Sequence, residues 1–176
     1  MVYKQESEID KQRKKSAMNN AIVFGVPFKK SENLLQVTTK ILGNIGAVSC
    51  CDSVISVSRI NASEKKSMPP IRIIFKDKKS KDLVFKLNKE SNKIPSTLID
   101  PSLKHTRNSS FITIRDELTP LSAELLNELR HAQEKLKLKY VWPGRGGVIL
   151  VKKDTNTKPL EVRNRLDLDK LLKHVC

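Results

Sequence analysis

The run AIVFGVP at residues 21–27 decides how the first two thirds of the chain is read. Within this run, the residues before Pro27 are mostly β-forming, and Pro27 ends the run. This pattern predicts a strand. Leu34, Val37 and Ile41 follow at helical spacing, so an amphipathic helix comes next. We therefore expect the first domain to begin with a strand and a helix.

The alternation of strands and helices continues after this pair. The runs VISVSRI at 54–60 and IRIIFK at 71–76 predict two more strands, residues 80–89 predict a short helix, and FITIR at 111–115 predicts a fourth strand. The order β-α-β-β-α-β is the split βαβ arrangement of ferredoxin-like and RNA-recognition-motif folds. We therefore expect an α+β fold in which residues 19–116 form an RNA-recognition-motif-like domain.

A second, smaller domain is expected over residues 117–176. Thr119 predicts a helix N-cap with Pro120 at the first helical position, and leucines four residues apart then line one helical face. A β-hairpin, a strand at 160–163 and a final helix follow. The pattern predicts a small α/β C-terminal domain made of helix, hairpin with strand, and helix.

Residues 1–18 form a separate basic segment, either helical or disordered. They are polar and charged and contain no Pro or Gly. Ile9 and Met18 are too sparse to define heptads, so the pattern favours a solvated tail.

The hairpin KYVWPGRGGVILVKK at 139–153 holds the only Trp and one of two Tyr residues of the chain. Strand alternation places Tyr140 and Trp142 on one side and Val141 on the other. If the core takes Val141, two rings are exposed beside Arg145, and aromatic rings next to cations are how single-stranded nucleic acids are held. If the core takes the rings, Val141 faces solvent. The first arrangement is favoured.

The net charge of the chain indicates which kinds of partner it binds. The 176 residues include 34 Lys and Arg against 19 Asp and Glu, a net charge of +15. The excess is spread along the chain, which favours nucleic acid over an anionic membrane or an acidic protein.

Several other classes of protein are disfavoured. No apolar run approaches the roughly 20 residues that span a bilayer, so no membrane partner is expected. Three cysteines make no plausible disulfide framework, which predicts a cytoplasmic or nuclear location. The histidines lack metal-ligand spacing and no phosphate-cradling glycine motif precedes a helix. We therefore expect neither an enzyme nor a cofactor.

These elements, in this order, resemble two related groups of proteins: the first-open-reading-frame protein of LINE-type retrotransposons and the baculovirus few-polyhedra (FP) protein with its insect-genome relatives. The resemblance covers roughly residues 19 to 175, and its most specific parts are residues 20–27, 70–75 and 139–143. GVILVKK at 147–153 looks closer to the FP type. The resemblance implies an insect-type or virus-related origin.

The retrotransposon resemblance also implies a function. Those proteins bind single-stranded RNA and DNA, and a basic-x-x-aromatic-Pro element contributes to binding. Lys139 and Trp142 match that element. A trimerising coiled coil precedes the domains in that family, and here it is missing or survives only as residues 1–18, which leaves self-association as a possible property.

The sheet of the first domain offers a second candidate surface. RNA-recognition motifs usually read bases with aromatics on strands one and three. The outward positions predicted here are Val23, Pro70 and Arg72, so those aromatics are missing. The face either binds through its cations or packs on a neighbouring segment.

We therefore expect largely sequence-independent binding of single-stranded RNA or DNA. The alternative is a protein-interaction module that binds acidic partners. The residues expected to bind nucleic acid are Arg59, Arg72, Lys76, Arg115, Arg130, Lys139, Tyr140, Trp142, Arg145, Lys152, Lys153 and Arg163.

Overall fold

The computed structural model describes residues 2–61, 68–105 and 110–173. The chain divides into two compact units. Asn19–Arg115 make up the first, called here the five-stranded unit, and Met1–Met18 together with Asp116–Cys176 make up the second, the three-stranded unit. In the part of the chain described, no helix is long and apolar enough to cross a membrane.

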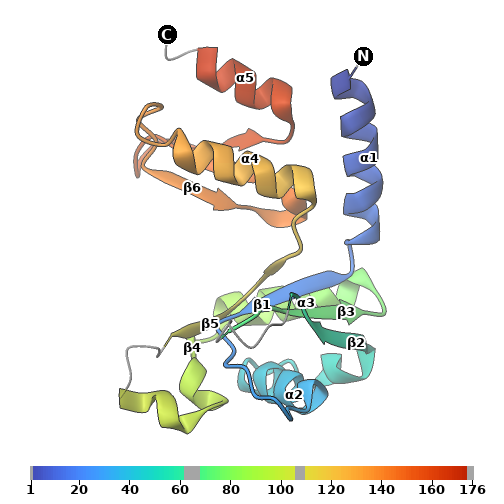
Figure 1. The fold of residues 1–176 in the computed structure, drawn as a ribbon. Coiled ribbons are helices and arrows are strands. Elements are labelled where there is room, and N and C mark those ends of the chain that lie inside the picture. Colours follow the sequence, from blue (N-terminus) through green and yellow to red (C-terminus); the bar gives the residue numbers. More distant parts are fainter. Residues whose placement is uncertain (1, 62–67, 106–109, 174–176) are drawn as a thin grey trace. The chain divides into compact units, whose positions relative to one another are not determined.

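The five-stranded unit has the β-α-β-β-α-β order expected from the sequence, with a short strand and two 3₁₀ turns inserted before the last strand (Figure 1). Its antiparallel sheet has the order β2-β3-β1-β5-β4. The α+β fold class is confirmed. The elements are β1 (Asn20–Phe24), α2 (Leu34–Asn44), η1 (Val48–Ser53), β2 (Val54–Arg59), β3 (Ile71–Phe75), α3 (Lys78–Glu90), β4 (Ile94–Pro95), η2 (Ser96–Leu98), η3 (Pro101–His105) and β5 (Phe111–Asp116).

One face of this sheet packs on a single apolar core with α2 and α3. Ile71, Ile73 and Phe75 alternate into that core from β3, and Val23 enters it from β1. The prediction that Val23 points outward was therefore wrong. Because AIVF is apolar at every position, alternation could not show which side of β1 meets the helices.

The three-stranded unit contains the expected helix, hairpin and helix. Its sheet has the order β6-β7-β8, and both pairs are antiparallel. A core of leucine, isoleucine and valine side chains lies between this sheet and its helices. The elements are α1 (Val2–Ser16), α4 (Pro120–His131), β6 (Tyr140–Pro143), η4 (Arg145–Gly147), β7 (Ile149–Lys152), β8 (Leu160–Val162) and α5 (Arg165–Lys173).

Residues 1–18, for which the sequence favours a solvated tail, contain helix α1 and belong to the three-stranded unit (Figure 1). Asp10 is only 4% exposed. Its carboxylate accepts a hydrogen bond from the hydroxyl of Thr119 and pairs with Lys14 at 2.8 Å. The Lys14 pair lies within α1, whereas the bond from Thr119 ties α1 to the start of α4; this attachment is polar, so a search for apolar heptads could not reveal it.

Three helices begin with a capping side chain. Asn33, Asp77 and Thr119 precede α2, α3 and α4, and each accepts a hydrogen bond from the backbone N–H three residues further on. That bond satisfies one of the N–H groups left unpaired at a helix start. The bond from the Ser80 N–H is also the main reason that the pKa of Asp77 lies below its usual value. The cap predicted at Thr119 is confirmed.

Candidate functional site

Tyr140 and Trp142 lie on the face of the small sheet that points away from the core. Val141, between them, packs against the core cluster, while Tyr140 is 41% exposed and Trp142 is partly buried. In the register of the hairpin, Tyr140 stands opposite Lys152 and Trp142 opposite Leu150. The favoured arrangement, with Val141 toward the core, is confirmed.

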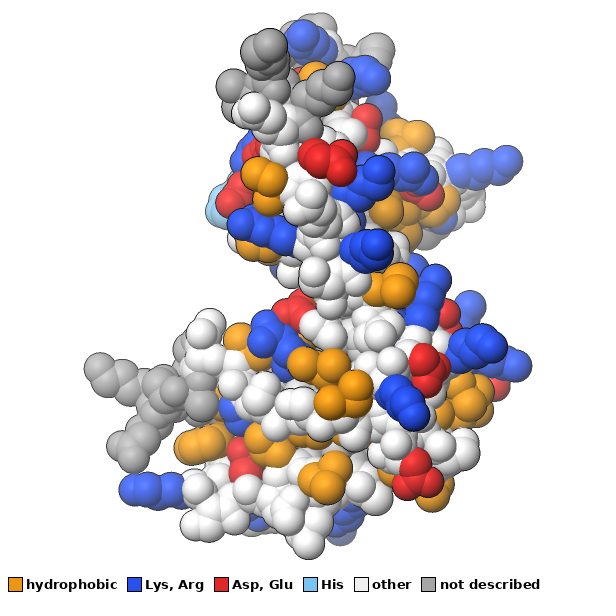
Figure 2. Space-filling model, turned by 90° about the vertical axis from the view of Figure 1, so that its right-hand side faces the viewer, with side chains coloured by type: hydrophobic (Ala, Val, Ile, Leu, Met, Phe, Trp, Pro, Cys, Tyr) orange, Lys and Arg blue, Asp and Glu red, His pale blue; other side chains and the backbone are white. Residues whose placement is uncertain are grey.

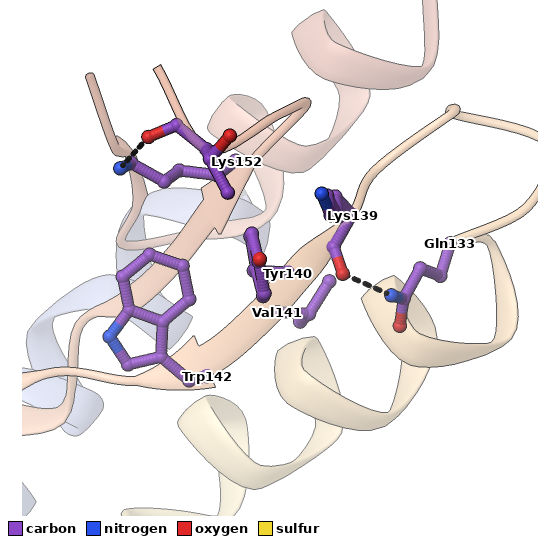
Figure 3. A pocket seen from close by; sticks show the side chains of 7 residues that line it. Gln133, Lys139, Tyr140, Val141, Trp142 and Lys152 are labelled. Atoms are coloured by element: carbon purple, nitrogen blue, oxygen red, sulfur yellow. Dashed lines mark hydrogen bonds between the residues drawn. The ribbon is translucent and has the colours of Figure 1, made fainter. Parts of the chain in front are cut away.

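The two rings line an open pocket of about 530 Å³. Backbone and side-chain hydrogen bonds hold its edge. The Lys139 N–H donates to the Lys152 carbonyl at 2.8 Å. The Gln133 amide donates to the Lys139 carbonyl at 3.2 Å (Figure 3). The rim therefore joins the end of α4 to both strands of the hairpin. The lining residues are Gln133, Lys139, Tyr140, Val141, Trp142, Lys152 and Thr155.

Two lysines bring positive charge to this pocket. The Lys139 ammonium lies 5.6 Å from the centre of the Tyr140 ring, within the range of a cation–π contact. The Lys152 ammonium donates to the Thr155 carbonyl at 3.2 Å. In Figure 3, Tyr140 lies between Trp142 and Lys139. The pocket therefore combines flat aromatic surface with two cations at its rim.

Arg145 does not line the pocket. Its guanidinium donates to the Asp116 carboxylate at 3.1 Å, and the same oxygen accepts the Gly146 N–H at 3.0 Å. Gly146 has a φ of +69°, which glycine adopts without strain. Asp116 thus anchors the turn of the hairpin, and part of the charge of Arg145 is neutralised there, although that side chain stays largely exposed.

The remaining predicted cations of this unit also lie outside the pocket. Arg130, Lys153 and Arg163 are exposed, and Arg163 forms an ion pair with Glu161 on the same strand end. Arg165, which was not predicted as a site residue, bonds to Glu6, Glu124 and Glu128. The bond to Glu128 is the main cause that raises the Arg165 pKa. Arg165 therefore links three helices.

In the five-stranded unit, Arg59 is a structural residue and not a surface cation. Its side chain is 5% exposed and pairs with Glu32, which is 9% exposed. The remaining donors of the guanidinium bond to the carbonyls of Val26, Pro27 and Pro69. The assignment of Arg59 as a nucleic-acid contact is corrected, because every donor already has a partner inside the protein.

The other three cations expected in that unit are more accessible. Lys76 and Arg115 are exposed, and Arg72 is half-buried. The Arg115 guanidinium lies 5.8 Å from the centre of the Phe24 ring. Lys76 follows β3, whereas Arg72 and Arg115 belong to β3 and β5.

Gln133 and Thr155 are pocket residues that the sequence did not reveal. Both lie outside regular strands, and they reach the rings only because α4 and the loop after β7 fold against the hairpin. No periodicity marks them. Leu150 is the cross-strand partner of Trp142. This pairing could have been predicted by aligning the two strands of the hairpin outward from its Pro-Gly turn.

Comparison with known proteins matches residues 119–172 to the family described as Baculovirus FP protein domain 2. The matched segment runs from the cap of α4 into α5 and contains the whole hairpin. No curated protein matches the chain. The FP part of the resemblance is thus supported for the C-terminal segment, and the likeness to retrotransposon proteins stays a resemblance of sequence motifs.

Proposed function

We propose that the three-stranded unit binds single-stranded RNA or DNA on the face formed by Tyr140 and Trp142. The observation that supports this most is that both rings line one open pocket together with Lys139 and Lys152, with the Lys139 ammonium against the Tyr140 ring. The match of this segment to an FP domain and its likeness to a nucleic-acid-binding retrotransposon element are consistent with the proposal.

In this proposal, bases stack on the indole and the phenol, and the ammonium groups of Lys139 and Lys152 meet the phosphates on either side. Stacking is tolerant of sequence because every base has a π face. A duplex hides those faces within its own stack, so single strands bind better. Each phosphate contact lowers log affinity by about 0.7 per tenfold rise in salt for single strands.

The second candidate is a protein-interaction module for acidic partners. It is favoured by the net charge of +15 and by the exposed Lys and Arg side chains, which are interspersed with hydrophobic ones on the face drawn in Figure 2. An acidic protein would respond to salt like a nucleic acid, but it has no need of the indole face. The ring therefore separates the two candidates.

The test is a titration of the full chain with fluorescently labelled single-stranded RNA, single-stranded DNA and duplex DNA, followed by anisotropy. Trp142→Ala should weaken single-strand binding by roughly 1–3 kcal/mol, while Trp142→Phe, which keeps a stacking ring, should lose less. Leu160→Ala removes an exposed apolar side chain from β8 and serves as the matched control, with unchanged affinity.

Equal affinity of Trp142→Ala and the native chain would reject stacking at this site and favour the acidic-partner alternative. A large fall in melting temperature for Trp142→Ala, without one for Leu160→Ala, would show that the indole supports the core. Tighter binding of the duplex than of single strands would also contradict the proposal.

A further inference from the structure

The two edges of the five-stranded sheet differ in how readily they accept a further strand. At one edge lies β4, which consists only of Ile94 and Pro95. A very short strand and a proline both hinder the addition of another strand. At the other edge lies β2, which is longer and has no proline (Figure 1). Within the residues described, β2 pairs with β3 alone, so its other side is open.

The pairing with β3 shows which backbone groups of β2 point to that open side. The Ile60 N–H, just after β2, donates to the Pro70 carbonyl at 2.8 Å. In an antiparallel pair, successive residues alternate between bonding to the neighbouring strand and pointing away from it. Ser58 and Ser56 therefore bond toward β3, as Ile60 does. Val57, between the two serines, directs its N–H and C=O to the open side.

This edge carries no free charge, although 30% of the residues of the chain are charged. The only charged residue of β2 is Arg59, whose side chain is 5% exposed and pairs with Glu32 inside the unit. Charged side chains on an edge strand oppose its pairing with another chain, and so do bulges. The one irregularity of β2 lies at its start, between Val54 and Ser56. The rest of the strand has neither protection.

Exposed aliphatic side chains lie on β2 and on the elements before it. Ile55, Val48 and Leu35 are 66%, 62% and 56% exposed, the three highest values among the large hydrophobic side chains described. They belong to β2, η1 and α2, and α2 contacts both of the other elements. A partner that adds a strand to β2 can therefore cover apolar surface as well as form backbone hydrogen bonds.

We propose that β2 is a self-association surface, at which two copies of this chain pair their β2 strands in antiparallel fashion. A twofold axis beside Val57 places this residue opposite Val57 of the second copy, and the two exchange their N–H and C=O groups. Ser56 then lies opposite Ser58 of the second copy. Five strands from each copy join into one continuous sheet, and the same patch serves both partners, as twofold symmetry requires.

Charge favours a second copy over other partners at this edge. An acidic protein or a nucleic acid would find no available cation on β2, because Arg59 is held by Glu32. Two copies with a net charge of +15 each repel one another over most of their surface, but pairing through β2 brings only uncharged side chains together. This surface lies outside residues 1–18, the segment in which the sequence suggested self-association.

The contact is small, so the dimer forms at high protein concentration. β2 has six residues, whereas a stable interface uses roughly 20–30 residues a side. Salt screens the repulsion between the two net charges and should therefore strengthen dimerisation. Binding of nucleic acid weakens with salt, so the two properties respond in opposite directions.

The first experiment is analytical ultracentrifugation of the full chain, freed of nucleic acid, at rising protein concentration and at two salt concentrations. A dimer that increases with both is expected. Ser56→Lys with Ser58→Lys changes two exposed side chains and sets like charges opposite each other across the twofold axis, so dimerisation should weaken at least fivefold. The control, Leu83→Lys with Leu160→Lys, adds the same charge at exposed positions of α3 and β8 and should dimerise as the native chain does.

The second experiment is hydrogen exchange of the native chain, read at single amides and at low and high protein concentration. Exchange at Val57 should slow as the dimer forms. Exchange at Ser58, whose N–H bonds to β3 in either state, should not change. This measurement needs no variant, so it decides the question if the double lysine variant fails to fold.

Three results would overturn the proposal. They are a native chain that stays monomeric at about 0.5 mM, exchange at Val57 that does not depend on concentration, and native dimerisation of a folded double lysine variant. A dimer formed through another surface would be recognised by the second of these results. None of them bears on the hairpin pocket, whose role is decided by its own titration.

Discussion

The two sheets carry their exposed rings in different ways. In the three-stranded unit, Tyr140 and Trp142 lie two residues apart on β6, an edge strand. In the five-stranded unit, Phe24 and Phe111 lie on two different strands that meet next to Gly25. A pair on one strand is fixed by strand geometry alone, whereas a pair on two strands depends on how the whole sheet is assembled.

The cations of the two units also differ in their roles. Lys139 and Arg115 lie against rings, but Arg59 and Arg165 are held by carboxylates within their own units. A high net charge is therefore not a measure of binding surface. Burial and acidic partners decide which cations remain available, and this distinction can be tested by changing one residue at a time.

The largest effect is expected for Arg59→Met. The change leaves Glu32 as a buried charge without its partner and frees three backbone carbonyls from their donors. Breaking a buried ion pair from one side costs about 3–5 kcal/mol. Urea unfolding read by hydrogen exchange in β1 and β3 should show the loss.

Lys76→Met is the matched control, because Lys76 is an exposed cation in the same unit. Its free energy of unfolding should change by no more than about 0.5 kcal/mol. If Arg59→Met were as stable as Lys76→Met, the structural role assigned to Arg59 would be wrong and its return to the list of surface cations would be justified.

Arg59 also illustrates what sequence could and could not predict. The strands at 21–26, 54–60, 71–76 and 111–115 and the hairpin were all found, because local composition and Pro or Gly breaks define them. The partner of Arg59 is Glu32, far away in the sequence, and no local pattern joins the two. Burial of that pair is a property of the assembled unit.

The exposed rings show the same difference between what the local sequence can and cannot predict. In the strand that holds Tyr140 and Trp142, the sequence could indicate which side chains face the core. Only one orientation of the strand buries the aliphatic side chain of Val141, which lies between the two rings. Every residue of AIVF in β1 is apolar, so alternation could not show which side chains face the core. Phe24 was therefore overlooked, and Val23 was predicted to point outward. To predict that Phe111 lies on a strand next to that of Phe24, the order of the strands must be known as well, and only the folded sheet shows that order.

Gly25 lies where β1 and β5 approach each other and bring Phe24 and Phe111 together. Gly25→Ala adds a Cβ at 2.4 Å from a backbone oxygen and strains a φ of +79°. Left-handed backbone costs about 1–2 kcal/mol for a residue with a side chain and overpacking about 1–3 kcal/mol more, so a loss of roughly 2–5 kcal/mol is expected in the same urea measurement.

Gly46→Ala provides the comparison within the unit. Gly46 has a similar φ of +76° but nothing within 4 Å of the added Cβ, so only the backbone strain of about 1–2 kcal/mol applies. Equal losses in the free energy of unfolding for the two variants would mean that β1 and β5 can move apart at no cost. The close approach of the two strands would then not be what keeps Phe24 and Phe111 together.

The smallest effect is expected at the polar attachment of α1 in the three-stranded unit. Thr119 both caps α4 and donates to the buried Asp10, so Thr119→Ala should cost about 1–2 kcal/mol. Thr119→Ser keeps the hydroxyl and should restore most of that loss. Trp142, the only tryptophan, reports unfolding of this unit by fluorescence. If α1 is held through Asp10, exchange of its amides should rise in Thr119→Ala and not in Thr119→Ser; a rise in neither would mean that α1 is attached by contacts other than this hydrogen bond.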